Sequence, residues 1–175
     1  MAVLLLLGGL LAWRSYTTSP GYSLGQLAVA VERNDWDGVQ KYVDLDSLIG
    51  QIIDVAVSKT IETDTSGFGA LAAGLAQSMK PTLIQQAKDS WRKSVESGSS
   101  SSGGTSGNFR PVFAAKRVKS VTRIGDEALV TVEVPSSGTT YDVRLRMKRV
   151  DNFWRVTSIE NLSDLPFMQD LGKGQ

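Results

Sequence analysis

The chain has 175 residues, of which 41% are hydrophobic and 21% are charged, a balance typical of an ordered globular protein with a sizeable core. Its net charge of +1 gives no electrostatic reason to expect binding to nucleic acid. The absence of cysteine and histidine excludes disulfides, thiol nucleophiles and the commonest general base and transition-metal ligand. We therefore expect a non-enzymatic protein without a cofactor.

The N-terminal stretch, MAVLLLLGGLLAW, contains no charged side chain. It is shorter than the roughly 20 apolar residues of a straight membrane span, but Trp13, Arg14 and Tyr16 are suited to the lipid headgroup layer. We interpret residues 1–18 as a membrane anchor or uncleaved signal, which predicts a single-pass protein with its soluble domain on the extracytoplasmic side. A cleaved signal and a buried core helix are the alternatives.

Helical periodicity dominates residues 22–95. Ser19-Pro20-Gly21 interrupts the chain before the first helix, which is followed by a short one over Trp36–Tyr42. A third helix is expected to end near Thr60, and a fourth to run from about Gly69 to Ser94, with Pro81 bending or splitting it. One apolar face is expected on the fourth helix, formed by Leu71, Leu75, Leu83, Ile84, Ala87 and Trp91.

Residues 97–107, SGSSSSGGTSG, form a flexible Gly/Ser segment between the helical half and a strand-rich half. One interpretation is a linker between domains. We favour a loop inside one domain spanning residues 19–165, because neither half alone covers its own apolar face.

An antiparallel sheet is predicted over residues 110–160, followed by a frayed tail over residues 166–175. In the third strand, apolar Tyr141, Val143, Leu145 and Met147 alternate with polar residues, and Asp151-Asn152 forms the turn to the fourth. The expected strands are Val112–Arg123, Glu127–Val134, Tyr141–Val150 and Phe153–Ile159. The fold class is therefore α+β, in which helices pack on a curved four-stranded meander of the NTF2-like or cystatin-like kind.

Several short segments are similar to the DUF2939 family of bacterial proteins of unknown function. They are Ser19-Pro20-Gly21-Tyr22, Leu27 and Ala30 with Asn34-Asp35, Tyr42-Val43-Asp44-Leu45, and Trp154-Arg155-Val156 with Ile159. The resemblance covers residues 19–54 and, less closely, residues 143–162. It implies an N-terminal membrane helix followed by a soluble domain, and it implies no activity.

Four carboxylates at Asp35, Asp37, Asp44 and Asp46 could bind calcium or magnesium, but they lack the spacing of a calcium loop. We interpret them as helix caps. Tyr42 and Asp44 could instead line a pocket, although packing of the Tyr42 ring and a local hydrogen bond are the simpler interpretation.

Arg144, Arg146 and Lys148 form a basic strand face that could contact anionic lipid headgroups or a partner protein. A solvated face partly neutralised by Glu133 and Asp142 is the alternative. Trp154 is predicted to lie in the core, together with Trp36 and Trp91; a ligand pocket beside them is the other interpretation. The candidate binding residues are thus Tyr42, Asp44, Arg144, Arg146 and Trp154.

Three functions remain open. The first is a membrane-tethered domain that binds a partner protein or serves as an accessory subunit of a membrane assembly. The second is a module that binds a small molecule or lipid between residues 48–53 and the strand face of Val143, Leu145 and Trp154. An enzyme of this fold ranks last, because no acid–base pair is evident.

Overall fold

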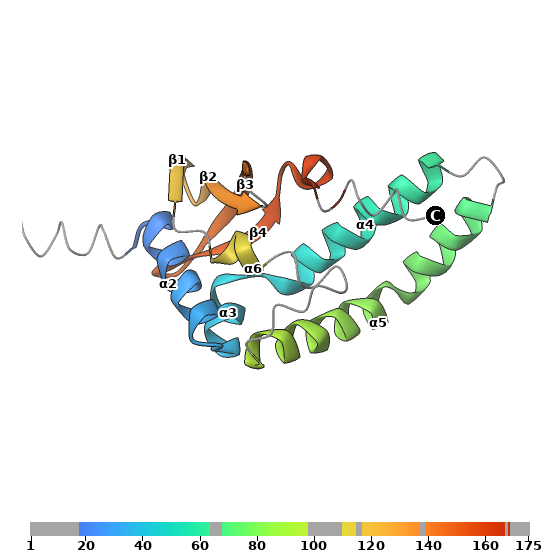
Figure 1. Cartoon of the computed structure of the whole chain (residues 1–175), viewed down its shortest axis with the longest axis horizontal. Coiled ribbons are helices and arrows are strands. Elements are labelled where there is room, and N and C mark those ends of the chain that lie inside the picture. Colours follow the sequence, from blue (N-terminus) through green and yellow to red (C-terminus); the bar gives the residue numbers. More distant parts are fainter. Residues whose placement is uncertain are drawn as a thin grey trace, which may run out of the picture.

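We analysed a computed structural model, which describes residues 18–63, 68–97, 110–114, 117–136, 139–166 and 168. Helices cover one face of a four-stranded antiparallel sheet, and the hairpin of helices α4 and α5 projects away from it (Figure 1). The predicted α+β class is confirmed. The helices are α2 (Pro20–Glu32), α3 (Trp36–Tyr42), α4 (Leu45–Thr63), α5 (Phe68–Glu96) and α6 (Arg110–Phe113), followed after the sheet by the 3-10 turn η2 (Leu162–Asp164).

The N-termini of the first three helices are capped by side chains that the sequence places there. Ser19 Oγ accepts a hydrogen bond from Tyr22 N at 3.1 Å, and Pro20 occupies the first helical position, where no N–H is needed. The carboxylates of Asp35 and Asp44 cap α3 and α4 in the same way. These caps fix where each helix begins.

Helix α5 continues through Pro81, so of the two outcomes expected there, a bend or a split, the split is wrong. Ion pairs to α4 lie on either side of the proline: Lys80 Nζ is 2.7 Å from Asp54 Oδ1, and Lys88 Nζ is 3.1 Å from Asp46 Oδ1. Contacts along both helices therefore hold the segment helical despite the missing backbone hydrogen bond at Pro81.

The sheet is a meander in the order β1-β2-β3-β4. Its strands are β1 (Arg117–Ile124), β2 (Glu127–Ser136), β3 (Thr139–Val150) and β4 (Phe153–Ile159). The turn predicted at Asp151-Asn152 is confirmed, with Asp151 at a φ of 51°. Irregularities in register between Val118 and Ser120 and between Arg146 and Met147 interrupt the regular pairing.

The first strand begins at Arg117 rather than at Val112, which corrects the predicted boundary. Val112 and Phe113 belong to α6, and both are buried. The ring of Phe113 packs edge-on against Trp91, with 6.3 Å between ring centroids. Pro111, in the first turn of α6, was the available signal for a helix start.

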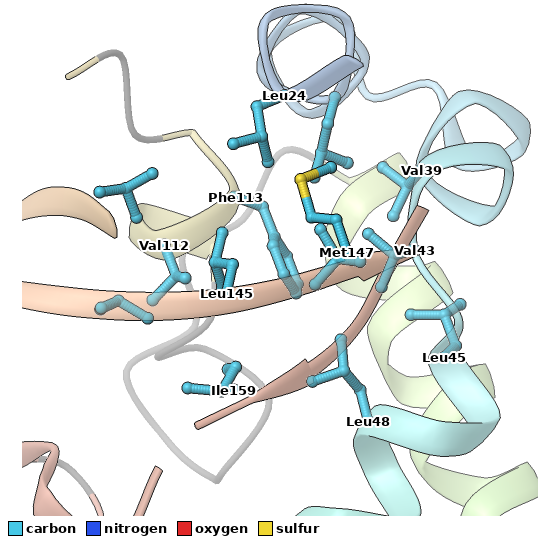
Figure 2. Packing of buried hydrophobic residues seen from close by; sticks show 14 of the residues in the cluster. Leu24, Val39, Val43, Leu45, Leu48, Val112, Phe113, Leu145, Met147 and Ile159 are labelled. Atoms are coloured by element: carbon cyan, nitrogen blue, oxygen red, sulfur yellow. The ribbon is translucent and has the colours of Figure 1, made fainter. Parts of the chain in front are cut away.

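The core lies between the sheet and the helices and forms one cluster drawn from both halves of the chain. Figure 2 shows Leu24 and Val39 from the helices on the side of β3 that carries Met147, whereas Leu48 of α4 lies farther along, toward Ile159 of β4. Trp36, Trp91 and Trp154 are all buried, which confirms that part of the prediction. Alternation along β2 and β3 places apolar side chains on this face and charged ones on the other.

The backbone groups on the outer edge of β4 form hydrogen bonds with the helices and the segments next to them, and not with another strand. Trp154 N donates to Ser23 Oγ at 2.9 Å, and Asp44 N donates to Val156 O at 2.8 Å. The Gln51 side chain forms a pair with Ile159: its Nε2 donates to Ile159 O at 2.7 Å, and its Oε1 accepts from Ile159 N at 3.0 Å. These contacts remove an edge that could otherwise pair with another chain.

The predicted membrane anchor over residues 1–18 and the Gly/Ser loop over residues 97–107 lie almost entirely outside the described residues. Among the helices that are described, none combines the length and the hydrophobicity needed to span a bilayer.

Candidate functional site

Tyr42, Val43 and Asp44 connect helix to sheet. The Tyr42 ring packs edge-on against Phe153, with 5.7 Å between centroids, and Lys41 Nζ lies 5.2 and 5.3 Å from the two rings. Val43 forms a parallel bridge with Val156. Asp44 Oδ1 accepts from Ser47 N at 3.2 Å, which confirms the capping interpretation.

The basic residues of β3 lie on the solvent-facing side of the sheet. Arg146 forms ion pairs with Glu127 (3.0 Å from Nη1 to Oε2) and with Glu160, and these carboxylates raise the pKa of the guanidinium, Glu160 more strongly. Arg144 is exposed, and its backbone N donates to Asn161 Oδ1. The carboxylates that neutralise Arg146 are thus Glu127 and Glu160, and not the predicted Glu133 and Asp142.

Two further ion pairs cover the same face. Lys119 Nζ lies 2.8 Å from Asp142 Oδ2, an interaction that raises the pKa of the ammonium group, and Arg117 pairs with Glu133 at 3.4 Å. All of these pairs involve exposed side chains, so each contributes little to stability.

Trp154 lies on the opposite face of the sheet from Arg144 and Arg146 and is fully buried. Its indole Nε1 donates to Thr18 O at 2.7 Å, and the Arg123 guanidinium lies 5.2 Å from the ring. The five candidate residues therefore do not form one site: Trp154 is in the core, Tyr42 and Asp44 connect α3 to β4, and the arginines face solvent.

The carboxylates near the starts of α3 and α4 have structural roles. Asp35 caps α3 through Gly38 N at 3.0 Å, and Asp46 reaches Lys88 on α5. Asp37 lies in the first turn of α3, where the helix dipole favours a negative charge. Within the described ranges, no group of three or more acidic residues is arranged to hold a metal ion.

The apolar residues proposed to line a ligand cavity belong to the hydrophobic core cluster. Leu48, Val143 and Leu145 are fully buried, and Figure 2 shows Leu48 and Leu145 among the clustered core side chains. Leu48 lies on α4, which meets the sheet mainly at β4, whereas Val143 and Leu145 lie on β3.

The feature that sequence reasoning missed is an exposed apolar stripe on α5. Leu71, Leu75 and Met79 are 67%, 61% and 51% exposed. Their spacing of four residues places them along one side of the helix. Ile84 and Trp91, which were expected on the same face, instead pack against the core. Successive residues of an α-helix are rotated by about 100° around its axis, so Leu71 and Ile84 are separated by roughly 220°. This angle indicates that the two residues lie on different faces of α5.

One family model matches part of the chain, most of its helical half. The model of DUF2939, described as a protein of unknown function, matches residues 10–88. No curated protein and no solved structure matches the chain. The matched range contains the α5 stripe and ends before the sheet, so the resemblance expected for residues 143–162 stays a prediction. The resemblance to the DUF2939 family is thus confirmed over residues 10–88.

Proposed function

We propose that this chain is a non-enzymatic, membrane-tethered α+β domain that binds a partner protein through the apolar stripe of α5, as an accessory subunit of a membrane assembly. The observation that carries the proposal is the exposure of Leu71, Leu75 and Met79 on one side of a helix. Single exposed apolar residues are common on protein surfaces, but a row at helical spacing is typical of a helix that docks into an apolar groove.

The stripe is free for a partner because α5 uses another side to contact α4. Lys80 and Lys88 reach Asp54 and Asp46 on α4, and Ile84 packs against the core. Helical geometry puts Leu71 and Leu75 on roughly the opposite side of α5 from Lys80.

The chemistry of the stripe favours an uncharged protein surface as the partner. No charged residue occurs between Phe68 and Met79. An anionic or cationic ligand would have no counter-charge on this segment, whereas an apolar helix or groove of another subunit would bury Leu71, Leu75 and Met79 without desolvating a charge.

The tether is supported by the uncharged apolar residues at positions 1–13. We place the soluble domain on the extracytoplasmic side. We also infer an NTF2-like or cystatin-like architecture, because helices α2, α3 and α4 contact one face of a four-stranded meander.

The test compares co-purification of the full chain with that of two variants, each solubilised from native membranes in mild detergent. The stripe variant carries Leu71→Gln, Leu75→Gln and Met79→Gln, which keep a good helix propensity. The control carries Val118→Thr and Val121→Thr, which remove exposed apolar surface from β1 while keeping β-branched residues.

We expect a stoichiometric protein partner to co-purify with the wild type and the control, and to be lost from the stripe variant. Retention of the same partner by the stripe variant, or purification of the wild type alone, would contradict the proposal.

A further inference from the structure

The described chain enters the domain at the end of the sheet that carries the β1–β2 and β3–β4 turns, hereafter the turn end. Thr18 O accepts from Trp154 Nε1, and Trp154 follows the β3–β4 turn by two residues. Ser23 Oγ fixes the same strand by accepting from Trp154 N. Residues 1–17, which include the apolar stretch, therefore join the domain at the turn end.

The same end presents the most exposed large hydrophobic side chain among the described residues. Ile124, the last residue of β1, is 79% exposed. Gly125, with a φ of +60°, makes the tight turn that follows it. The neighbouring Arg123 guanidinium lies 5.2 Å from the Trp154 ring, whose Nε1 donates to Thr18 O, so β1 also ends near the region of Thr18.

Basic side chains outnumber acidic ones around the turn end. Asp126 and Asp151 lie in the turns, and Glu127 is already paired with Arg146. The basic residues are Lys41, Arg123, Lys148, Arg149 and Arg155. Lys41 and Arg155 also lie beside the Phe153 ring, at 5.3 and 5.9 Å from its centroid. Cations next to exposed apolar and aromatic groups are suited to the interface of an anionic bilayer.

We propose that the turn end rests on an anionic lipid surface, with Ile124 in the interfacial layer and the surrounding basic residues against lipid phosphates. The inference rests on the membrane tether of the proposed function and adds an orientation to it. Figure 1 places the far tip of the α4–α5 hairpin on the opposite side of the molecule from α2. With the turn end on lipid, the α5 stripe is held away from the bilayer, where a partner protein can reach it.

The test uses the absence of native cysteine to place one environment-sensitive fluorophore at a chosen position. Ile124→Cys labels the turn end. Thr140→Cys labels an exposed position at the other end of the sheet, opposite Pro135. The full chain is reconstituted into vesicles of phosphatidylcholine alone or of phosphatidylcholine and phosphatidylglycerol in equal parts, with bromine-labelled acyl chains as the quencher.

We expect the label at Ile124 to be quenched by the bromolipid, more strongly in the anionic vesicles, and the label at Thr140 to stay in water. Lys148→Gln in the labelled chain should lower the ratio of lipid-bound to free turn ends about fivefold in anionic vesicles, because one basic contact is lost. The matched control, Arg144→Gln, removes an exposed charge from the middle of β3 and should leave the ratio unchanged.

Equal and weak quenching at Ile124 and Thr140 in protein that floats with the vesicles would overturn this orientation and leave the tether standing. Shielding of Ile124 from water without bromolipid quenching would also overturn it, because it indicates a protein contact. Failure of the chain to float with the vesicles would overturn the tether and the orientation together.

Discussion

The contact between Gln51 and Ile159 offers the sharpest test of how the helices are held on the sheet. The side-chain amide of Gln51 uses both its donor and its acceptor on one residue of β4, at 2.7 and 3.0 Å. Ile159 is fully buried and Gln51 is half-buried, so the Gln51 amide limits the access of water to both backbone groups of Ile159. Gln51→Ala removes both partners at once.

The expected cost follows from the two groups left unsatisfied. A buried donor or acceptor without a partner costs about 1–3 kcal/mol, and the better helix propensity of Ala offsets a few tenths of that. We expect Gln51→Ala to lower the free energy of unfolding by about 2–4 kcal/mol. In urea, with a slope of about 1–3 kcal/mol per molar, this corresponds to a midpoint shift of roughly 1–2 M.

The assay is urea unfolding of the full chain in detergent, followed by tryptophan fluorescence. Gln77→Ala is the matched control, because Gln77 is exposed and its Nε2 makes one long contact, 3.3 Å, with Asp54. That control should cost less than about 0.5 kcal/mol. Equal midpoints for the two variants would show that Gln51 does not hold the edge of β4, and the reasoning would be wrong.

Three further predictions concern stability and titration. Pro81→Ala restores a backbone N–H donor in the exposed middle of α5 but also gives the unfolded chain more conformational freedom. The net effect on the free energy of unfolding, measured by calorimetry, should be a stabilisation of about 2 kcal/mol. An unchanged melting temperature would refute this. Trp154→Phe removes the hydrogen bond to Thr18 and part of a buried ring, so denaturant unfolding should show a loss of about 1–3 kcal/mol, and a neutral effect would contradict its role. Burial raises the pKa of Tyr141 above its ordinary value near 10. The stabilisation from the neutral phenol is therefore fully present below pH 10 and is lost as the pH rises through the folded-state pKa. Ultraviolet titration of the wild type against Tyr141→Phe should reveal a late-titrating phenol, and the absence of that phenol would refute the shift.

Much of the architecture could be predicted because local signals agree with the tertiary structure. Alternation along β3 and the Asp151-Asn152 turn specify the β3–β4 hairpin, with the buried side carrying Val143, Leu145 and Met147. Caps at Ser19, Asp35 and Asp44 set the helix starts. These features depend on residues within a few positions of one another, which a sequence displays directly.

The remaining features depend on contacts between distant residues. The proline in α5 is tolerated because contacts with α4 hold the helix on both sides of it. Gln51 and Ser23 look like ordinary polar residues of helices until β4 is placed against them, 108 and 131 positions away. The relative placement of the candidate residues also depends on how β3 and β4 pair, which puts Trp154 on the opposite face of the sheet from Arg144 and Arg146.

The division of α5 into two faces was within reach of sequence reasoning. Apolar residues at Leu71, Leu75, Ile84 and Trp91 were assigned to one face, although their spacing does not fit a single helical stripe. Which of the two faces would be buried still required the position of α4. The exposed face is the one on which the proposed function depends.

The most direct test of that function is photo-crosslinking in living cells from a single position in the stripe. A benzophenone amino acid replaces Leu75, which is 61% exposed on α5. The control carries the same group at Ser163, an exposed position in η2. We predict one discrete protein adduct from Leu75 that is absent from Ser163 and disappears when Leu71 and Met79 are also changed to Gln. Crosslinking of Leu75 to lipid alone, or the same adducts from both positions, would contradict the account.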